Sequence, residues 1–251
     1  MPATLGAATT REGLFASTRW TIVRNADESQ ASPSQSLNAL SELCQIYWRP
    51  VYLFLRRQGT AQHDAQDLTQ GFFAELIESR AYKRADPSKG RFRSFLLGAV
   101  KHFIADARDR ERAQKRGGGV APVQLDEAAI SEAEVQAARS DNWGADRVYE
   151  REWAAALLRQ ALDRLNQECV LAGKGALFDG LKSHLSAGAG TIPYDKIAPQ
   201  RGRPATTLRS DVARLRTRYR VILREEVSGT VIEPSEVDEE LRHLCQVMAA
   251  D

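Results

Sequence analysis

The sequence has little of what catalysis, metal binding or disulfide formation requires. Its three cysteines, Cys44, Cys169 and Cys245, are widely separated, and no two of them have the spacing of a zinc finger. The four histidines are scattered, and no HExxH, GxxxxGK[ST], GxGxxG or GxSxG segment occurs. We therefore expect free thiols in a reducing compartment, no metal, no cofactor and no enzymatic activity.

Long apolar runs are also absent. No stretch approaches the roughly 20 apolar residues that span a membrane, and the first residues lack the apolar core of a secretory signal. We therefore expect a cytoplasmic protein without membrane insertion. Aromatic residues make up only 7% of the chain while Leu and Ala are abundant, and this composition favours helices.

Charge is present but unevenly distributed. The net charge of +2 conceals two basic segments. Residues 80–119 hold twelve basic and four acidic side chains, and residues 196–224 hold nine basic and one acidic. Two such segments predict two contacts with a polyanion, and nucleic acid is the first candidate. For residues 80–119, a solvated surface helix with a positive end explains the composition equally well.

The periodicity of apolar residues predicts an all-α protein made of two small helical domains joined by a linker. We expect an N-terminal segment at 1–35, a first helical domain at 36–117 and an acidic linker at 118–147, with room for short helices in the linker. A second domain at 148–228 precedes an acidic tail at 229–251. Pro50 should kink or divide the first long helix of the first domain.

The second basic segment predicts a helix-turn-helix. Leu208, Val212, Leu215, Tyr219 and Ile222 recur at helical spacing, and the arginines fall on the opposite arc. Gly202 can supply the turn, and Pro204 suits the first turn of the second helix. That helix would enter the major groove with its N-terminal residues. The alternative is a solvated amphipathic helix that packs on its neighbour.

Asp64 and Asp67 stand at the start of another apolar-periodic helix. We expect Asp64 to cap this helix and Asp67 to hold a capping-box-like position. The alternative is a pair of metal-binding carboxylates, as in a metal-dependent nuclease.

Taken together, these segments resemble bacterial RNA polymerase sigma factors of the sigma-70 family, extracytoplasmic-function (ECF) type. YWRPVYLFLRRQG resembles the helix that opens region two, and DAQDLTQGFF (Asp64–Phe73) is similar to the D-x-x-D-L-x-Q-x-x-F signature. FRSFLLGAVKHFIADARDRERAQKR (Phe92–Arg116) resembles the promoter-melting helix. TTLRSDVARLRTR (Thr206–Arg218) resembles the recognition helix of region four.

The resemblance implies three interfaces. The clamp helices of the polymerase core would be met by Asp64, Asp67, Gln70 and Phe73. The single-stranded proximal promoter element would be held by Tyr82, Lys83, Arg84, Lys89, Arg91, Arg93, Phe95, Lys101, His102 and Arg108. The duplex upstream element would be read by Thr206, Thr207, Arg209, Ser210, Ala213, Arg214, Arg216 and Arg218.

The predicted function is therefore that of a sigma factor, which directs core polymerase to specific promoters and aids their opening. An anti-sigma factor is a further candidate partner. The alternatives are a stand-alone helix-turn-helix regulator and, third, a metal-dependent nuclease using Asp64 and Asp67. Phe95 stands where the family usually has Trp, and His102 where it has Asn. The acidic tail lies outside the family pattern, and one hypothesis is that it masks the basic helix in the free protein.

Overall fold

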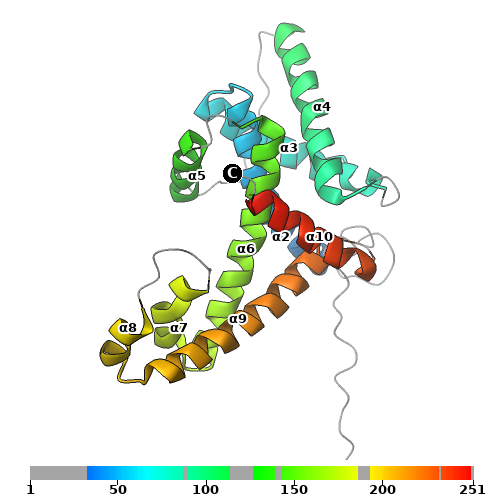
Figure 1. The fold of residues 1–251 in the computed structure, drawn as a ribbon. Helices are drawn as coiled ribbons and strands as arrows, with labels where there is room; N and C mark the ends of the chain where they lie inside the picture. Colours follow the sequence, from blue (N-terminus) through cyan, green and yellow to red (C-terminus); the bar gives the residue numbers. More distant parts are fainter. Residues whose placement is uncertain are drawn as a thin grey trace, which may run out of the picture.

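All regular elements of the described residues are helices in a computed structural model of the chain (Figure 1). The structure describes residues 33–86, 90–113, 127–139, 143–185, 193–231 and 233–249. The longer helices are α2 (Pro33–Arg57), α3 (Gln62–Glu78), α4 (Phe92–Ala113), α5 (Glu127–Arg139), α6 (Ala145–Leu171), α9 (Ala205–Ser228) and α10 (Val237–Ala249). The shorter ones are η1 (Ala81–Arg84), α7 (Gly175–Leu181), η3 (Lys182–His184), α8 (Tyr194–Arg201) and η4 (Pro234–Glu236). The all-α prediction is confirmed for these residues.

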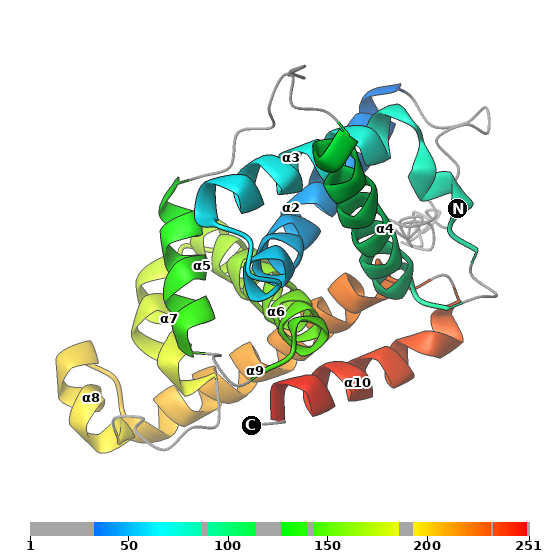
Figure 2. The same ribbon diagram turned by 90° about the horizontal axis from the view of Figure 1, so that it is seen from above.

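α2 is the central helix of the fold. The five consecutive residues from Val51 to Leu55 are each at most 1% exposed, because α3, α5 and α6 pack around the helix (Figure 2). α2 runs through Pro50 as one helix, so the predicted division does not occur. A proline inside a helix removes one backbone hydrogen bond, and dense tertiary packing is what offsets such a loss.

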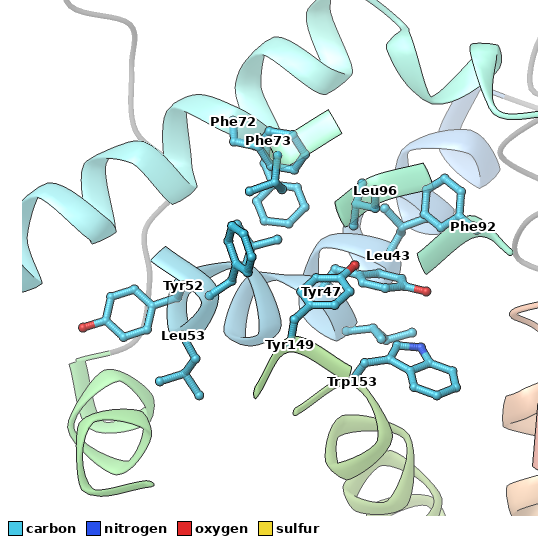
Figure 3. Close-up of a cluster of buried hydrophobic side chains, with 14 of the residues drawn as sticks. Leu43, Tyr47, Tyr52, Leu53, Phe72, Phe73, Phe92, Leu96, Tyr149 and Trp153 are labelled. Atoms are coloured by element: carbon cyan, nitrogen blue, oxygen red, sulfur yellow. The ribbon is translucent and has the colours of Figure 1, made fainter. Parts of the chain in front are cut away.

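The main core joins aromatic side chains of α2, α3, α4 and α6 (Figure 3). The ring of Tyr47 on α2 meets that of Phe92 on α4 edge-on, with centroids 5.7 Å apart. Phe72 on α3 makes the same kind of contact with Phe103 on α4 at 5.6 Å. Trp153 of α6 has no exposed surface in this core. The first basic helix, α4, is thereby packed on α2, α3 and α6.

α6 crosses the boundary predicted between linker and second domain. It begins at Ala145, and its residues up to Leu157 belong to the main core. Beyond that point Ala161 and Leu165 pack in a second, smaller core with Ile222 of α9. α5 lies inside the predicted linker and packs on α2. The segment predicted as a linker therefore contains a packed helix and the first turn of another.

The predicted acidic tail folds as η4 and α10 and returns to the main core. Val237 and Leu244 are 4% and 2% exposed there, and α10 packs along α6 and α9. Figure 1 shows α10 beside the upper part of α6, and α7 and α8 at the opposite end of the molecule from α4. Within the described ranges, no helix has the length and hydropathy of a membrane-crossing segment.

Candidate nucleic-acid and polymerase interfaces

A tight turn at Gly202 joins α8 to α9. Gly202 has φ +58°, a left-handed conformation that costs glycine little, and its N–H reaches the carbonyls of Ala198 and Pro199. Pro204 follows as the residue immediately before α9, not within it. Four buried residues hold the two helices together: Leu181, Ile197, Leu208 and Val212. The two helices and the turn predicted here are therefore present.

The N-terminal half of α9 presents an open, polar and basic surface. Its exposed side chains are Thr206, Thr207, Arg209, Ser210, Ala213 and Arg214. The guanidinium of Arg209 lies over the ring of Tyr194, 5.8 Å from its centroid, and that ring lies against His184. Arg214 is 81% exposed beside Asp211. Arginine on an exposed helix start is suited to guanine edges in a major groove.

Arg216 and Arg218 lie further along α9 and make internal contacts. Arg216 donates from Nε and Nη2 to the His184 carbonyl, at 3.1 and 2.7 Å. Arg218 donates from the same two atoms to the Glu168 carboxylate of α6, at 2.7 and 2.6 Å. These hydrogen bonds lower the pKa of Glu168. The prediction that these two residues contact the upstream element is corrected, because their guanidinium groups brace α9 against η3 and α6.

Arg93 lies on α4 but faces inward. At about 100° per residue it shares a face with Ile104, and it is only 8% exposed. Its Nε lies 2.8 Å from Glu150, its Nη1 pairs with Glu240, and its guanidinium stands 4.7 Å from the Trp153 ring centroid. Burial alone would lower the pKa of Arg93, but the two carboxylates raise it. The predicted DNA contact is corrected, because this side chain is enclosed by protein.

Arg91, just before α4, is surrounded by three carboxylates of the C-terminal segment. Its Nη2 lies 3.0 Å from Glu239 and its Nε 3.3 Å from Glu240, while Nη1 pairs with Glu236. The Arg91 side chain is 17% exposed. A predicted DNA-binding residue is thus held by acidic groups of the same chain.

The other predicted residues of the first basic segment differ in exposure. Arg84, His102 and Arg108 are exposed. Lys101 is exposed as well, with its Nζ 2.7 Å from Asp146 of α6.

Tyr82 and Lys83 are less accessible, and one predicted residue is not described. Tyr82 is 6% exposed and belongs to the main core, so the structure corrects the prediction that its ring contacts DNA. Lys83 is half-buried. Lys89 lies outside the described residues.

A groove of about 520 Å³ separates α3 from α4 beside Phe95. Phe95 is partly exposed, and Arg84 and His102 line the same groove. Its apolar wall is formed by Phe72, Leu76, Ala99 and Phe103. An accessible aromatic ring next to cationic and polar groups can hold an unpaired base by stacking.

α3 carries the four residues predicted to meet core polymerase. Asp64 and Asp67 are exposed, and Gln70 is half-buried. Phe73 is 2% exposed and packs with Phe72, their centroids 5.2 Å apart. The prediction that Phe73 contacts core polymerase directly is therefore corrected, because its ring is buried and anchors α3 to the main core. The three polar residues remain for the outer face of α3.

The predicted capping role of Asp64 is wrong. α3 begins at Gln62, so Ala61 is the N-cap and makes no side-chain capping bond. Asp64 lies in the first turn, where a carboxylate interacts favourably with the helix dipole. Asp67 instead lies 3.2 Å from the Nδ1 of His63. Across the described ranges, no group of three His, Cys, Asp or Glu side chains is placed to hold a metal ion.

An acidic helix, an aromatic-lined groove and a basic helix therefore follow one another along residues 62–113. Residues 43–114 match the sigma-70 region 2 family. The match runs from α2 to the end of α4 and includes the Asp64–Phe73 segment. It supports sigma-70 membership and a role in transcription initiation with RNA polymerase and promoter DNA. No curated protein and no solved structure matches the chain.

The acidic partners of Arg91 and Arg93 were missed by reasoning from the sequence. Glu240 is three residues after Val237 and four before Leu244, so the helical spacing places it on the buried face. An acidic residue within an apolar stripe is the signal that indicates a buried ion pair. Its arginine partners could not be identified from the pattern alone.

Proposed function

We propose that this chain is an ECF-type sigma factor that directs core RNA polymerase to specific promoters and helps to open them. The observation that carries the proposal is the region 2 match at residues 43–114. It includes the acidic surface of α3 and the basic helix α4. A second basic helix, α9, begins about a hundred residues later with an exposed N-terminal half.

Contact with core polymerase would be made by the outward face of α3. Asp64, Asp67 and Gln70 remain accessible there, and buried Phe73 keeps the helix in position. The polymerase element expected opposite is the clamp-helix pair of the largest subunit. Exposed carboxylates suit a basic partner, since complementary charge steers association.

DNA contact is divided between two surfaces. The groove beside Phe95, with Arg84, His102 and Arg108 exposed nearby on η1 and α4, would hold the non-template strand of the proximal element. The N-terminal half of α9 would read the upstream element in the major groove. In this proposal, double-stranded DNA binds at the start of α9, and single-stranded DNA binds at the groove beside Phe95.

The chain is expected to act in the cytoplasm, where polymerase is, and an anti-sigma factor remains a candidate regulator. A stand-alone helix-turn-helix regulator is the alternative. It has no need of a polymerase-binding surface on α3, so the region 2 match favours the sigma factor.

The decisive experiment is a pull-down of bacterial core polymerase by the purified chain, followed by run-off transcription from genomic promoter fragments. We expect stable association and transcripts that start at discrete positions. Asp67→Asn should weaken association, while Glu78→Gln, an exposed carboxylate later on α3, serves as the matched control. Binding to DNA but not to core would instead indicate a regulator. Metal-dependent cleavage lost in Asp64→Ala would indicate a nuclease.

A further inference from the structure

The C-terminal segment holds the start of α4 through two kinds of ion pair. Glu240 is 2% exposed and pairs with Arg93, whose side chain is 9% exposed. Glu236 and Glu239 approach Arg91 from the surface, and their side chains are 35% and 69% exposed. Buried pairs are costly to break, whereas solvent-exposed pairs contribute little and exchange readily. The pair of Glu240 with Arg93 is therefore the fixed part of this contact. The pairs of Glu236 and Glu239 with Arg91 are its replaceable part.

The replaceable part surrounds a good phosphate ligand. Nε, Nη1 and Nη2 of Arg91 each point to a different carboxylate, so the whole guanidinium fork is occupied by anionic oxygens. Phosphate oxygens bind the same fork with the same geometry. An arginine that collects three carboxylates is in a position to accept a phosphate in place of the outer two.

Arg91 also adjoins the groove beside Phe95. Its carbonyl accepts hydrogen bonds from the N–H groups of Ser94 and Phe95, at 3.0 and 3.1 Å, and both residues line the groove. A strand whose base lies in the groove would bring its backbone close to the first turn of α4. Arg84 lines the groove itself, and Arg91 stands at the end of α4 that this backbone would reach.

We propose that Arg91 is an exchangeable anion site, in which Glu236 and Glu239 occupy the position of a phosphate of single-stranded DNA. In the free chain these carboxylates lower the affinity of α4 for DNA, and binding of the strand displaces them. The identity of the strand as promoter DNA rests on the proposed function, but the exchange itself does not. Glu240 stays with Arg93, so α10 remains docked while the site changes ligand.

The rest of α10 supports a segment that stays in place. Val237 and Leu244 are buried in the main core, and Arg151 donates to the carbonyls of Val247 and Met248 at 3.5 and 3.4 Å. Asp238, on the same helix, pairs with Arg224 of α9 and not with Arg91. Asp238→Asn therefore removes one charge from α10 without freeing Arg91, and it is the matched control for E239Q alone.

The test is binding of a fluorescent 20-nucleotide oligothymidylate to the full-length chain, followed by anisotropy in the absence of polymerase. The double variant E236Q/E239Q keeps the side-chain shapes and removes two charges. We expect it to bind roughly five-fold more tightly at about 0.1 M salt, because one added phosphate contact on a single strand steepens the salt dependence by about 0.7. D238N should change the affinity by less than about two-fold.

Arg91→Ala distinguishes exchange of ligands at Arg91 from a general effect of removing negative charge on DNA affinity. In the R91A background, E236Q/E239Q should bind no more tightly than R91A alone. A gain that persists there, or equals that of D238N, overturns the proposal, and so does absence of oligothymidylate binding in every variant. Circular dichroism checks that each variant is folded, and E239Q alone gives the same comparison if the double variant is not. Because polymerase is absent, failure of the core pull-down leaves this result unaffected.

Discussion

Arg218 donates two hydrogen bonds to Glu168 and thereby ties the middle of α9 to the last turns of α6. The two side chains are 41% and 35% exposed, so solvent screens the pair. Such a pair stabilises the packing of two helices without shielding either from DNA. The exposed N-terminal residues of α9 make no such contact with α6, and Arg216 and Arg218 both bind other parts of the chain.

The first prediction concerns this pair. Arg218→Ala should lower the melting temperature slightly and leave sequence discrimination on duplex DNA unchanged. A double-mutant cycle with Glu168→Ala should give a coupling free energy below about 1 kcal/mol. Thermal and urea unfolding of the four proteins measure it. Loss of DNA affinity with unchanged unfolding would contradict the structural role.

The second prediction concerns Arg209, which is exposed over Tyr194. Arg209→Ala should cost about 1–3 kcal/mol on the preferred upstream element and relax the choice of base there. Binding to the preferred and to scrambled duplexes measures the difference. Arg220, exposed in the second half of α9, is the matched control, and R220A should weaken both duplexes equally. Equal losses for R209A on both duplexes would make Arg209 a phosphate contact.

The third prediction concerns Arg93, whose guanidinium stands against the Trp153 ring. Arg93→Ala removes the buried cation shared by Glu150 and Glu240, which keep only His243 and Arg91 nearby, so the free energy of unfolding should fall by about 3–5 kcal/mol. Urea unfolding measures this loss. Arg108→Ala, an exposed change on the same helix, should shift it by no more than about 0.5 kcal/mol. If R93A unfolds like the wild type but loses DNA binding, Arg93 is a DNA ligand after all.

The fourth prediction is a pH dependence that involves Glu134 of α5. Arg56 donates to both of its oxygens, at 2.6 and 2.8 Å, and Tyr52 donates to one of them. Hydrogen bonding by Arg56 lowers the pKa of Glu134 below its ordinary value of 4.5. The unfolded chain then binds the proton more readily, so this contribution is complete above about pH 4.5 and is lost as pH falls through the lowered pKa.

Glu134→Gln should therefore lower the free energy of unfolding by about 1–2 kcal/mol at pH 7. The difference from the wild type should shrink steadily below about pH 4.5. Urea titrations between pH 3 and pH 7 measure it, with E78Q as the control of equal charge change. A difference that does not vary with pH would mean that the carboxylate contributes through shape alone.

The helices could be predicted because their apolar residues repeat locally. Phe92, Leu96 and Val100 have helical spacing, and all three are buried on α4. The exposed arginine face at the start of α9 was predicted from the same helical spacing of apolar residues. Ion pairs between distant segments could not be predicted in this way. Arg93 and Glu240 are 147 residues apart, and no local pattern specifies which buried cation meets which buried anion.

The packing of α5 inside the predicted linker and the start of α3 before Asp64 could not be read from the sequence. α5 is rich in alanine and has only two large apolar residues, Ile130 and Val135, so the sequence does not display that it packs against α2. Asp64 resembled a cap because it precedes the apolar repeat, but the helix starts two residues earlier at Gln62. Helix ends are set by backbone partners more than by the side-chain pattern.

α6 belongs to the main core at one end and to the second core at the other, without a break over 27 residues. Such a helix is about 40 Å long, so it fixes both the distance between the two cores and their rotation about the helix axis. One residue inserted at its middle would turn the second half of the helix, with α7 packed on it, by about 100° about the axis and advance it by about 1.5 Å. That movement would oppose the contacts of α9, whose Val227 lies in the main core. The length of α6 in residues therefore has to match that of α9 between the two cores, because each of these helices packs in both.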